Sequence, residues 1–398
     1  MRFRHRDGTL VHLAYCTNVH PAETLAGVLA QIDRYAVPIR AALGTSRLGL
    51  GLWLAADVVA ELTTDPAAVA RLRAALADRG LEVVTFNGFP YRGFHDEVVK
   101  GAVYRPDWTT GDRLAYTLNL AGLLAALLPA AAAGGSISTL PLAWRHPWGA
   151  DQQQQVKARL TELASGLAAQ AERSGRPVRV GFEPEPGCVV ENTTQAATHL
   201  SEVDSEWLGV CLDACHLAVG FEQPAAALSR LDAAGLPVIK AQASCALQVD
   251  DPADPATRRL LAGFVEPRFL HQARAGDRAG TGDHAAAALS GVDDLDQALA
   301  GGLPDSHPWR VHFHVPLHAP AAAPLASTQP VLRDTLRELL GGPTARTAHV
   351  EVETYTWQVL PAAARPETDA DLVAGIAAEL SWTRDRLLDL GLTQEEPG

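Results

Sequence analysis

The sequence predicts an α/β fold, a single (β/α)8 barrel, from three observations. Short β-like runs alternate with longer Ala-, Leu-, Arg- and Glu-rich stretches of helical spacing, which is typical of βα units around a parallel sheet. Four of the apolar runs end in Glu, Asp or His, and barrels of this kind build their active sites at the carboxyl ends of the strands. A length of 398 residues, of which 47% are hydrophobic, suits one large core.

Each element is predicted from its own stretch of sequence. The expected strands are residues 11–16, 48–54, 81–87, 136–142, 178–183, 208–213, 238–244, 311–315 and 348–353. The expected helices are residues 21–43, 65–79, 112–128, 151–174, 193–203, 224–234, 331–340 and 369–390.

This count gives one strand too many for an eight-stranded barrel. We interpret residues 238–244 as the seventh barrel strand and residues 349–353 as the eighth. Residues from about 246 to 309 then form a long insertion over the mouth of the barrel, in an excursion that also carries residues 311–314. The sequence thus predicts one domain over residues 1–392, followed by a frayed tail over residues 393–398.

Alternation along the strands separates the polar side chains from the apolar ones. Val178, Val180 and Phe182 share one face, so Glu183 points the other way. The same parity sets Asp213, Glu353 and the pair His312 and His314 opposite their apolar neighbours. We expect these side chains to converge inside the mouth of the barrel, because unpaired charge is costly on an otherwise apolar strand.

A divalent cation is the partner that this set of side chains favours. Asp213 and His216 form a D-x-x-H turn directly after a strand, and His312 and His314 form an H-x-H pair. Oxygen and imidazole ligands suit Zn²⁺, Mn²⁺, Fe²⁺ or Co²⁺, and an all-oxygen site suits Mg²⁺. Taken singly, each has a simpler explanation: the aspartate as a helix cap, the histidines as a solvated pair and Glu183 as half of an ion pair. Their joint occurrence at strand ends favours the metal.

Further polar and aromatic residues at the mouth are expected to contact a substrate, and an aromatic side chain there stacks well on a sugar or cyclitol ring. They are Asn87, Trp144, Glu185, Gln242, Glu351 and Tyr355. Lys240 shares a face with Gln242, and a salt bridge inside the barrel is its preferred interpretation.

Composition excludes several classes of function. A net charge of −13 argues against nucleic acid as a partner, because phosphate binding needs clustered Lys and Arg. The Ala- and Leu-rich segment 118–133 contains Pro129 and is short for a membrane span, so no stable membrane insertion is expected. The five cysteines are scattered and form no C-x-x-C pair, which fits reduced thiols in the cytoplasm. The sequence has no phosphate-binding loop, dinucleotide fingerprint or serine-hydrolase elbow.

Longer motifs carry a resemblance to a known family. Glu at the fifth strand, D-x-x-H at the sixth and Glu at the last resemble the xylose-isomerase-like barrels, which include sugar isomerases, ketose 3-epimerases, inosose dehydratases and class II AP endonucleases. The runs AYCTNVHPAET, FNGFPYRGFH, FEPEPGC, CLDACHLAVGFE, HFHVPLH and HVEVETYTW are similar to EboE-type metabolite traffic proteins, which are linked to a small cyclitol-like metabolite. This resemblance implies that other proteins of the same pathway are partners.

The resemblance implies metal ligands at Glu183, Asp213 and Glu353, with His216 as a ligand or substrate contact. The chain departs from the family at its seventh strand, where Gln242 stands in place of the usual histidine. Either its amide oxygen binds the metal, or His312 or His314 supplies the missing imidazole.

Three functions remain open from the sequence. The first is a metal-dependent isomerase, epimerase or dehydratase for a small polyol, sugar or cyclitol, in which Glu183 and Glu353 transfer protons and His216 orients the substrate. The second is a non-catalytic carrier that reuses the barrel pocket to bind a metabolite. A metal-dependent hydrolase ranks third, because barrel hydrolases place H-x-H at the first strand, whereas here the motif comes late.

Overall fold

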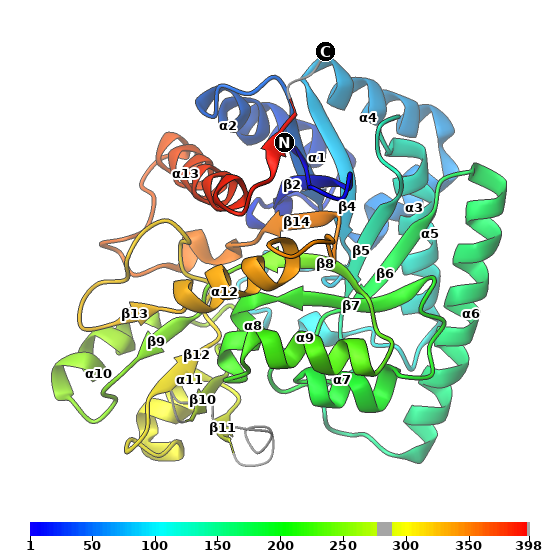
Figure 1. Ribbon diagram of the computed structural model, residues 1–398. Coiled ribbons are helices and arrows are strands. Elements are labelled where there is room, and N and C mark those ends of the chain that lie inside the picture. Colours follow the sequence, from blue (N-terminus) through cyan, green and yellow to red (C-terminus); the bar gives the residue numbers. More distant parts are fainter. Residues whose placement is uncertain (277–288, 396–398) are drawn as a thin grey trace.

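A closed ring of eight parallel strands forms the centre of the computed structural model, which describes residues 1–276 and 289–395 (Figure 1). Each strand pairs with the next along the chain, and the last strand closes the ring against the first. The strands are β2 (Leu10–Cys16), β3 (Leu48–Leu52), β4 (Leu81–Asn87), β5 (Gly135–Thr139), β6 (Val178–Phe182), β7 (Leu208–Asp213), β8 (Val238–Ala243) and β14 (His349–Val352). The (β/α)8 fold predicted from the alternating pattern is confirmed.

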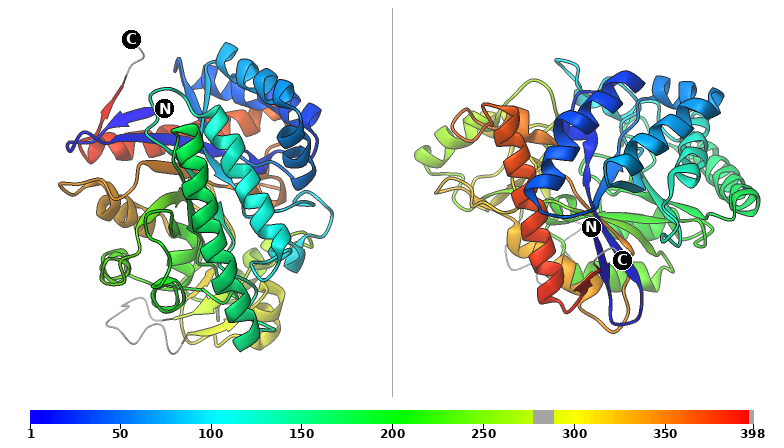
Figure 2. Two further views of the ribbon diagram at one scale, coloured as in Figure 1. Left: turned by 90° about the vertical axis from the view of Figure 1, so that its right-hand side faces the viewer. Right: turned by 90° about the horizontal axis from the view of Figure 1, so that it is seen from above.

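Helices surround this ring and bury its outer face (Figure 2). They are α1 (Leu25–Gln31), α2 (Val37–Ala42), α3 (Ala56–Thr64), α4 (Pro66–Asp78), α5 (Gly111–Leu127), α6 (Ala150–Ser174), α7 (Thr193–Leu200), α8 (Ala214–Val219), α9 (Pro224–Ala233), α12 (Gln329–Leu340) and α13 (Asp369–Asp389). Side-chain oxygens of Asp65, Thr110, Asn192 and Thr368 accept backbone N–H groups at the starts of α4, α5, α7 and α13, which fixes where these helices begin.

Several helical regions differ from the sequence prediction. The helix expected over residues 21–43 is α1 and α2 joined by a π-helical segment, Ile32–Ala36, which lies just before Pro38. Proline has no N–H to donate, so a change in the hydrogen-bond ladder beside it is expected. Helices α3 and α8 were not predicted, because both follow a strand end without a long periodic stretch.

A second sheet covers the carboxyl end of the barrel, where the chain leaves β8. Its order is β11-β10-β12-β9-β13, from β9 (Leu247–Val249), β10 (Ala273–Ala275), β11 (Ser290–Val292), β12 (Trp309–Val311) and β13 (Ala326–Ser327), and α10 (Pro255–Leu261) and α11 (Leu295–Gln297) lie in the same excursion. The sheet extends past residue 309, where the insertion was expected to end. Because β12 ends at Val311, His312 and His314 stand on an irregular segment, not on the strand from which their common orientation was inferred. Residues 277–288 of the predicted insertion lie outside the described residues.

Both ends of the chain meet on one side of the barrel (Figure 2). Strand β1 (Arg2–Arg4) pairs with the start of β2 and with β15 (Thr393–Gln394). Thr393 and Gln394, expected to be part of a frayed tail, are therefore held by backbone pairing, while residues 396–398 lie outside the described residues. Among the helices described here, none is both long and apolar enough to cross a membrane.

An ion pair fills the interior of the ring below the mouth. The Lys240 Nζ and Glu351 Oε2 atoms lie 2.9 Å apart, and both side chains are wholly buried. Gly51 on β3 leaves the space for this carboxylate, because a Cβ atom there would come within 1.8 Å of Glu351 Oε2. The salt bridge predicted for Lys240 is present. Its partner is Glu351, which the sequence analysis expected to contact a substrate.

Candidate active site

Three carboxylates converge at the carboxyl ends of the barrel strands. Glu183 follows β6, Asp213 ends β7 and Glu353 follows β14. Each offers an oxygen atom within 4.8 Å of the others, and all three side chains are buried. The strand-end pattern therefore brings together residues that lie far apart in the sequence.

Hydrogen bonds from neighbouring groups hold Asp213 and Glu353, each through only one of its two carboxylate oxygens. Asp213 Oδ1 accepts hydrogen bonds from the backbone N–H of His216 and from Ser244 Oγ, each over 2.8 Å. Asp213 is thus the cap of α8, as the simpler interpretation of the D-x-x-H turn held, but its Oδ2 atom remains without a hydrogen-bond partner. Glu353 Oε1 accepts from the side-chain amides of Asn18 and Asn87, again over 2.8 Å each.

A cation suits the carboxylate oxygens that have no hydrogen-bond partner. Glu183 Oε2 and Asp213 Oδ2 are buried and lack a hydrogen-bond partner, which is costly for oxygen atoms that carry charge. Burial, together with the nearby Glu353 and Asp213 carboxylates, raises the pKa of Glu183 well above its usual range. Burial and Asp213 likewise raise the pKa of Glu353 to about 8. Mutual repulsion among carboxylates is what a divalent ion at their centre would neutralise.

Three histidines lie beside the carboxylates. His216 is the third residue of α8, and its Nδ1 atom lies 3.0 Å from the carbonyl oxygen of Pro184. Its Nε2 atom lies 3.0 Å from Nε2 of His312. Burial lowers the pKa of His216 to about 4 and that of His314 below its usual value, so both rings are neutral at physiological pH.

Glu185 and the excursion complete the site. Glu185 Oε1 accepts a hydrogen bond from Tyr104 Oη over 2.7 Å, and Gln272 Nε2 donates to Tyr104 Oη over 2.9 Å. Burial raises the pKa of Glu185 to about 8. Gln272 Oε1 in turn accepts from His312 Nδ1 over 2.7 Å, so one network joins β6, the loop after β4 and the second sheet.

A cavity opens onto these groups. Part of its lining consists of Glu183, Glu185, Glu353 and the three histidines, and another part is largely aromatic. The aromatic residues are Phe89, Phe94, Tyr104, Phe269 and Tyr355. Lys100 also lines the cavity and is paired with Asp294 of the excursion.

The predicted substrate contacts divide into two groups. Asn87, Glu185 and Tyr355 line the cavity. Among the residues that the structure describes, the cavity lining does not include Trp144, Gln242 or Glu351. Trp144 packs behind it on the ring of Tyr104, with ring centroids 4.8 Å apart, and Glu351 lies deeper in the barrel against Lys240. Glu351 lies below the mouth of the barrel because it stands on β14 two residues before Glu353, and hence one layer further inside.

Gln242 is buried on β8, and both polar atoms of its side chain lack hydrogen-bond partners. An unpaired buried amide beside the carboxylates is consistent with a weak oxygen ligand. Sequence reasoning missed Asn18, Tyr104 and Gln272, because none of them ends a predicted strand. It also missed Ser244, which ends the strand predicted over residues 238–244 but carries neither a charge nor an imidazole.

Comparison with known proteins agrees with this architecture. Residues 49–263 match the family described as xylose isomerase-like TIM barrel. No curated protein matches the sequence. A xylose isomerase-like TIM barrel protein from Mycobacterium smegmatis in complex with magnesium is 11% identical, with 95% of this chain and 98% of that chain covered and a TM-score of 0.50.

Two other solved structures of the same fold contain ligands. D-allulose 3-epimerase from Methylomonas sp., in complex with D-allulose, is 12% identical, with 97% of this chain and 99% of that chain covered and a TM-score of 0.49. The IOLI protein with a bound zinc atom is 12% identical, with 95% and 99% covered and a TM-score of 0.47. At these identities the likeness concerns the fold alone. The family match covers more than half of the sequence, and the chain therefore belongs to the xylose isomerase-like TIM barrel family.

Proposed function

We propose that this protein is a metal-dependent isomerase, epimerase or dehydratase that acts on a small polyol, sugar or cyclitol. The observation that carries the proposal is the buried triad Glu183, Asp213 and Glu353, in which two oxygen atoms lack hydrogen-bond partners. These three residues would hold the cation, with His216 beside them as a ligand or substrate contact. When bound, a divalent cation polarises a carbonyl or hydroxyl oxygen and so acidifies the neighbouring C–H bond.

We infer that the two glutamates move the proton. Glu183 and Glu353 lie on opposite sides of Asp213 in the strand order, because β6 and β7 are neighbours and β14 follows β8. A base whose pKa lies near the working pH takes and returns a proton efficiently, and the pKa of Glu353 is raised to about 8. Two such carboxylates suit the removal of a proton from one carbon and its return to the same or the adjacent carbon.

The aromatic wall supports a ring-shaped or sugar-like substrate. Tyr355 packs edge to face on Phe94 and Phe269 at centroid distances of 5.5 and 5.0 Å, and all three line the cavity. Such faces stack on the C–H surface of a sugar or cyclitol while the carboxylate wall binds its oxygens.

The pathway is a further part of the proposal. The motif runs resemble EboE-type metabolite traffic proteins, which supports a cyclitol-like metabolite as the substrate class and other proteins of that pathway as partners.

All five cysteines are free, as expected for a protein of the reducing cytoplasm.

Hydrogen exchange at carbon tests the reaction across a panel of candidate substrates. Protein loaded separately with Mg²⁺, Mn²⁺, Co²⁺ or Zn²⁺ would be incubated in D₂O with ketoses, inososes and polyols, and deuterium at carbon would be measured by NMR. We expect exchange with the native chain, loss of exchange in Glu183→Gln and Glu353→Gln, and no change in Glu206→Gln, which alters an exposed carboxylate.

Other outcomes separate the rival functions. Binding of a polyol without exchange, and a biological output unchanged by Glu183→Gln with Asp213→Asn, would support a carrier. Failure to bind any divalent cation at stoichiometric level would remove the metal-dependent reaction.

A further inference from the structure

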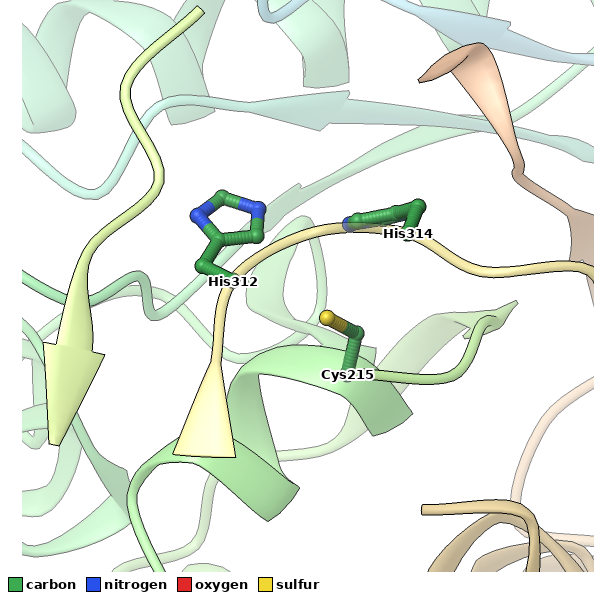
Figure 3. Close-up of side chains that lie close together, drawn as sticks. All are labelled: Cys215, His312 and His314. Atoms are coloured by element: carbon green, nitrogen blue, oxygen red, sulfur yellow. The ribbon is translucent and has the colours of Figure 1, made fainter. Parts of the chain in front are cut away.

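A cysteine and two histidines form a second group of metal-binding side chains next to the carboxylates. Cys215 is the second residue of α8, and His312 and His314 follow β12. Figure 3 shows the Cys215 Sγ atom directed toward the space between the two imidazole rings. The sulfur and one nitrogen of each ring lie within 4.8 Å of one another, and all three side chains are buried.

Hydrogen bonds fix which ring nitrogen carries the proton. His314 Nδ1 lies 2.7 Å from the carbonyl oxygen of Glu353, which can only accept, so Nδ1 carries the hydrogen. Gln272 Nε2 donates to the carbonyl oxygen of Pro186 over 2.9 Å, which turns Gln272 Oε1 toward His312. His312 Nδ1 therefore donates as well, and in both neutral rings Nε2 presents its lone pair.

Among the described residues, the only donor recorded for the His312 lone pair is the Tyr355 hydroxyl, 3.4 Å from Nε2, and the His314 lone pair has none. His314 Nε2 is buried and makes no hydrogen bond. His312 Nε2 faces His216 Nε2 at 3.0 Å, and His216 already donates its Nδ1–H to the carbonyl of Pro184. Two bare nitrogens at this distance repel each other unless a cation lies beside them. Metal-bound histidines show the same arrangement, with Nδ1–H donated to an oxygen and Nε2 turned to the metal.

We propose that Cys215, His312 and His314 bind a second, thiophilic divalent cation of the Zn²⁺ type, distinct from the ion of the carboxylate triad. The thiol makes the difference in chemistry, because sulfur and imidazole ligands select zinc-like ions whereas three carboxylates accept Mg²⁺ or Mn²⁺. Binding would convert the Cys215 thiol into a metal-bound thiolate and release one proton to solvent. Three protein ligands leave a fourth position for solvent or substrate, as in catalytic zinc sites.

The surroundings of Cys215 suit a ligand that must be held in place. Its backbone N–H donates to Ser244 Oγ over 2.9 Å, and the same hydroxyl donates to Asp213 Oδ1. One serine therefore positions Cys215 and Asp213 together. Ala218, Val219 and Ala246 pack around the cysteine and keep water away from it.

Cobalt substitution tests this site by a readout other than activity. Metal-stripped full-length protein would be titrated with Co²⁺ while the near-ultraviolet thiolate-to-cobalt charge-transfer band is recorded. We expect two Co²⁺ ions per chain, of which one produces the band. The band should vanish in Cys215→Ser and weaken at least tenfold in apparent affinity in His314→Gln, yet remain in Cys188→Ser, which alters a buried thiol outside the group.

The same titration separates this site from the proposed function. Glu183→Gln with Asp213→Asn should abolish hydrogen exchange at carbon and retain the band. A native chain that exchanges carbon-bound hydrogen but shows no charge-transfer band would overturn the second site and leave the proposed function standing. Persistence of the band in Cys215→Ser would also refute it. If Cys215→Ser does not fold, the native titration and His314→Gln decide the matter.

Discussion

The Nε2 atoms of His216 and His312 face each other at 3.0 Å, while the Nδ1 atoms of both rings are held by oxygen atoms of Pro184 and Gln272. The two residues are 96 positions apart; one belongs to the barrel and the other to the segment that follows β12 of the second sheet. This contact brings the excursion into the candidate active site.

The protonation of these rings can be predicted. Burial lowers the pKa of His216 to about 4, and burial and the neighbouring histidines lower that of His312. At pH 7 in the presence of a chelator, we expect His216, His312 and His314 to be neutral with hydrogen on Nδ1. Nitrogen-15 NMR of histidine-labelled protein reports this tautomer directly, and Zn²⁺ should shift the Nε2 signals of His312 and His314. An imidazolium at pH 7, or hydrogen on Nε2 of His314, would contradict the assignment.

A second prediction concerns the amides that hold Glu353. Asn18 and Asn87 each donate to Glu353 Oε1, and such donors stabilise the ionised carboxylate that a cation requires. Replacing Asn18 by Leu should therefore raise the pKa of Glu353 further and weaken metal binding by about tenfold to a hundredfold, as is usual for groups that support a ligand. Isothermal titration measures the affinity.

The exposed Gln154→Leu on α6 serves as the control and should bind metal like the native chain. Equal affinity in Asn18→Leu would mean that Glu353 is not a ligand, or that Asn87 alone holds it.

A third prediction concerns the ion pair inside the barrel. Glu351→Leu leaves the Lys240 ammonium buried without its partner at 2.9 Å, which should lower the free energy of unfolding by about 3–5 kcal/mol. The double variant Lys240→Met with Glu351→Leu should recover most of this loss, because it removes both charges and keeps the volume. Urea unfolding of the single and double variants provides the measurement, and an equally unstable double variant would show that the pair itself stabilises the barrel.

Strand periodicity was sufficient to predict the ring and the carboxylate triad. Glu183, Asp213 and Glu353 each stand at or just past a strand end, and parallel strands of one barrel bring such positions together. These predictions need only the local sequence: a short apolar run predicts a strand, and the last residue of that strand lies at the mouth of the barrel.

The rest of the site depends on contacts that no local pattern contains. Glu351 has the same parity as Glu353 but lies one layer deeper, so alternation alone could not distinguish a substrate contact from half of a buried pair. His312 and His314 lie beside the carboxylates, but the strand that was to orient them ends at Val311. Their positions depend on the fold of the second sheet, and Tyr104 and Gln272 enter the site only through that packing.

A fourth prediction concerns Glu379 of α13, which joins two loops of the active site. Its Oε1 atom accepts from Thr354 Oγ1 over 2.6 Å and from the Leu317 N–H over 3.1 Å, and its Oε2 atom accepts from Trp357 Nε1 over 3.1 Å. One carboxylate therefore ties the segment after His314 to the segment after Glu353. Burial raises the pKa of Glu379 from 4.5 to about 7.

The sign of the effect on stability follows from this raised pKa. Between pH 4.5 and 7 the folded protein holds a proton on Glu379 that the unfolded chain has lost, so its contribution is present at low pH and disappears as the pH rises. The loss is about 1.4 kcal/mol per pH unit, or about 3 kcal/mol over the whole interval. Glutamine does not titrate, so the native chain should lose stability relative to Glu379→Gln as the pH rises from 5 to 7.

Urea unfolding at pH 5, 6 and 7 in the presence of a chelator measures this difference. The exposed Glu206→Gln should instead run parallel to the native chain at every pH. If Glu379→Gln also runs parallel, the carboxylate is ionised throughout this range, and the two loops are then held by a permanent charge whose three hydrogen bonds outweigh its burial.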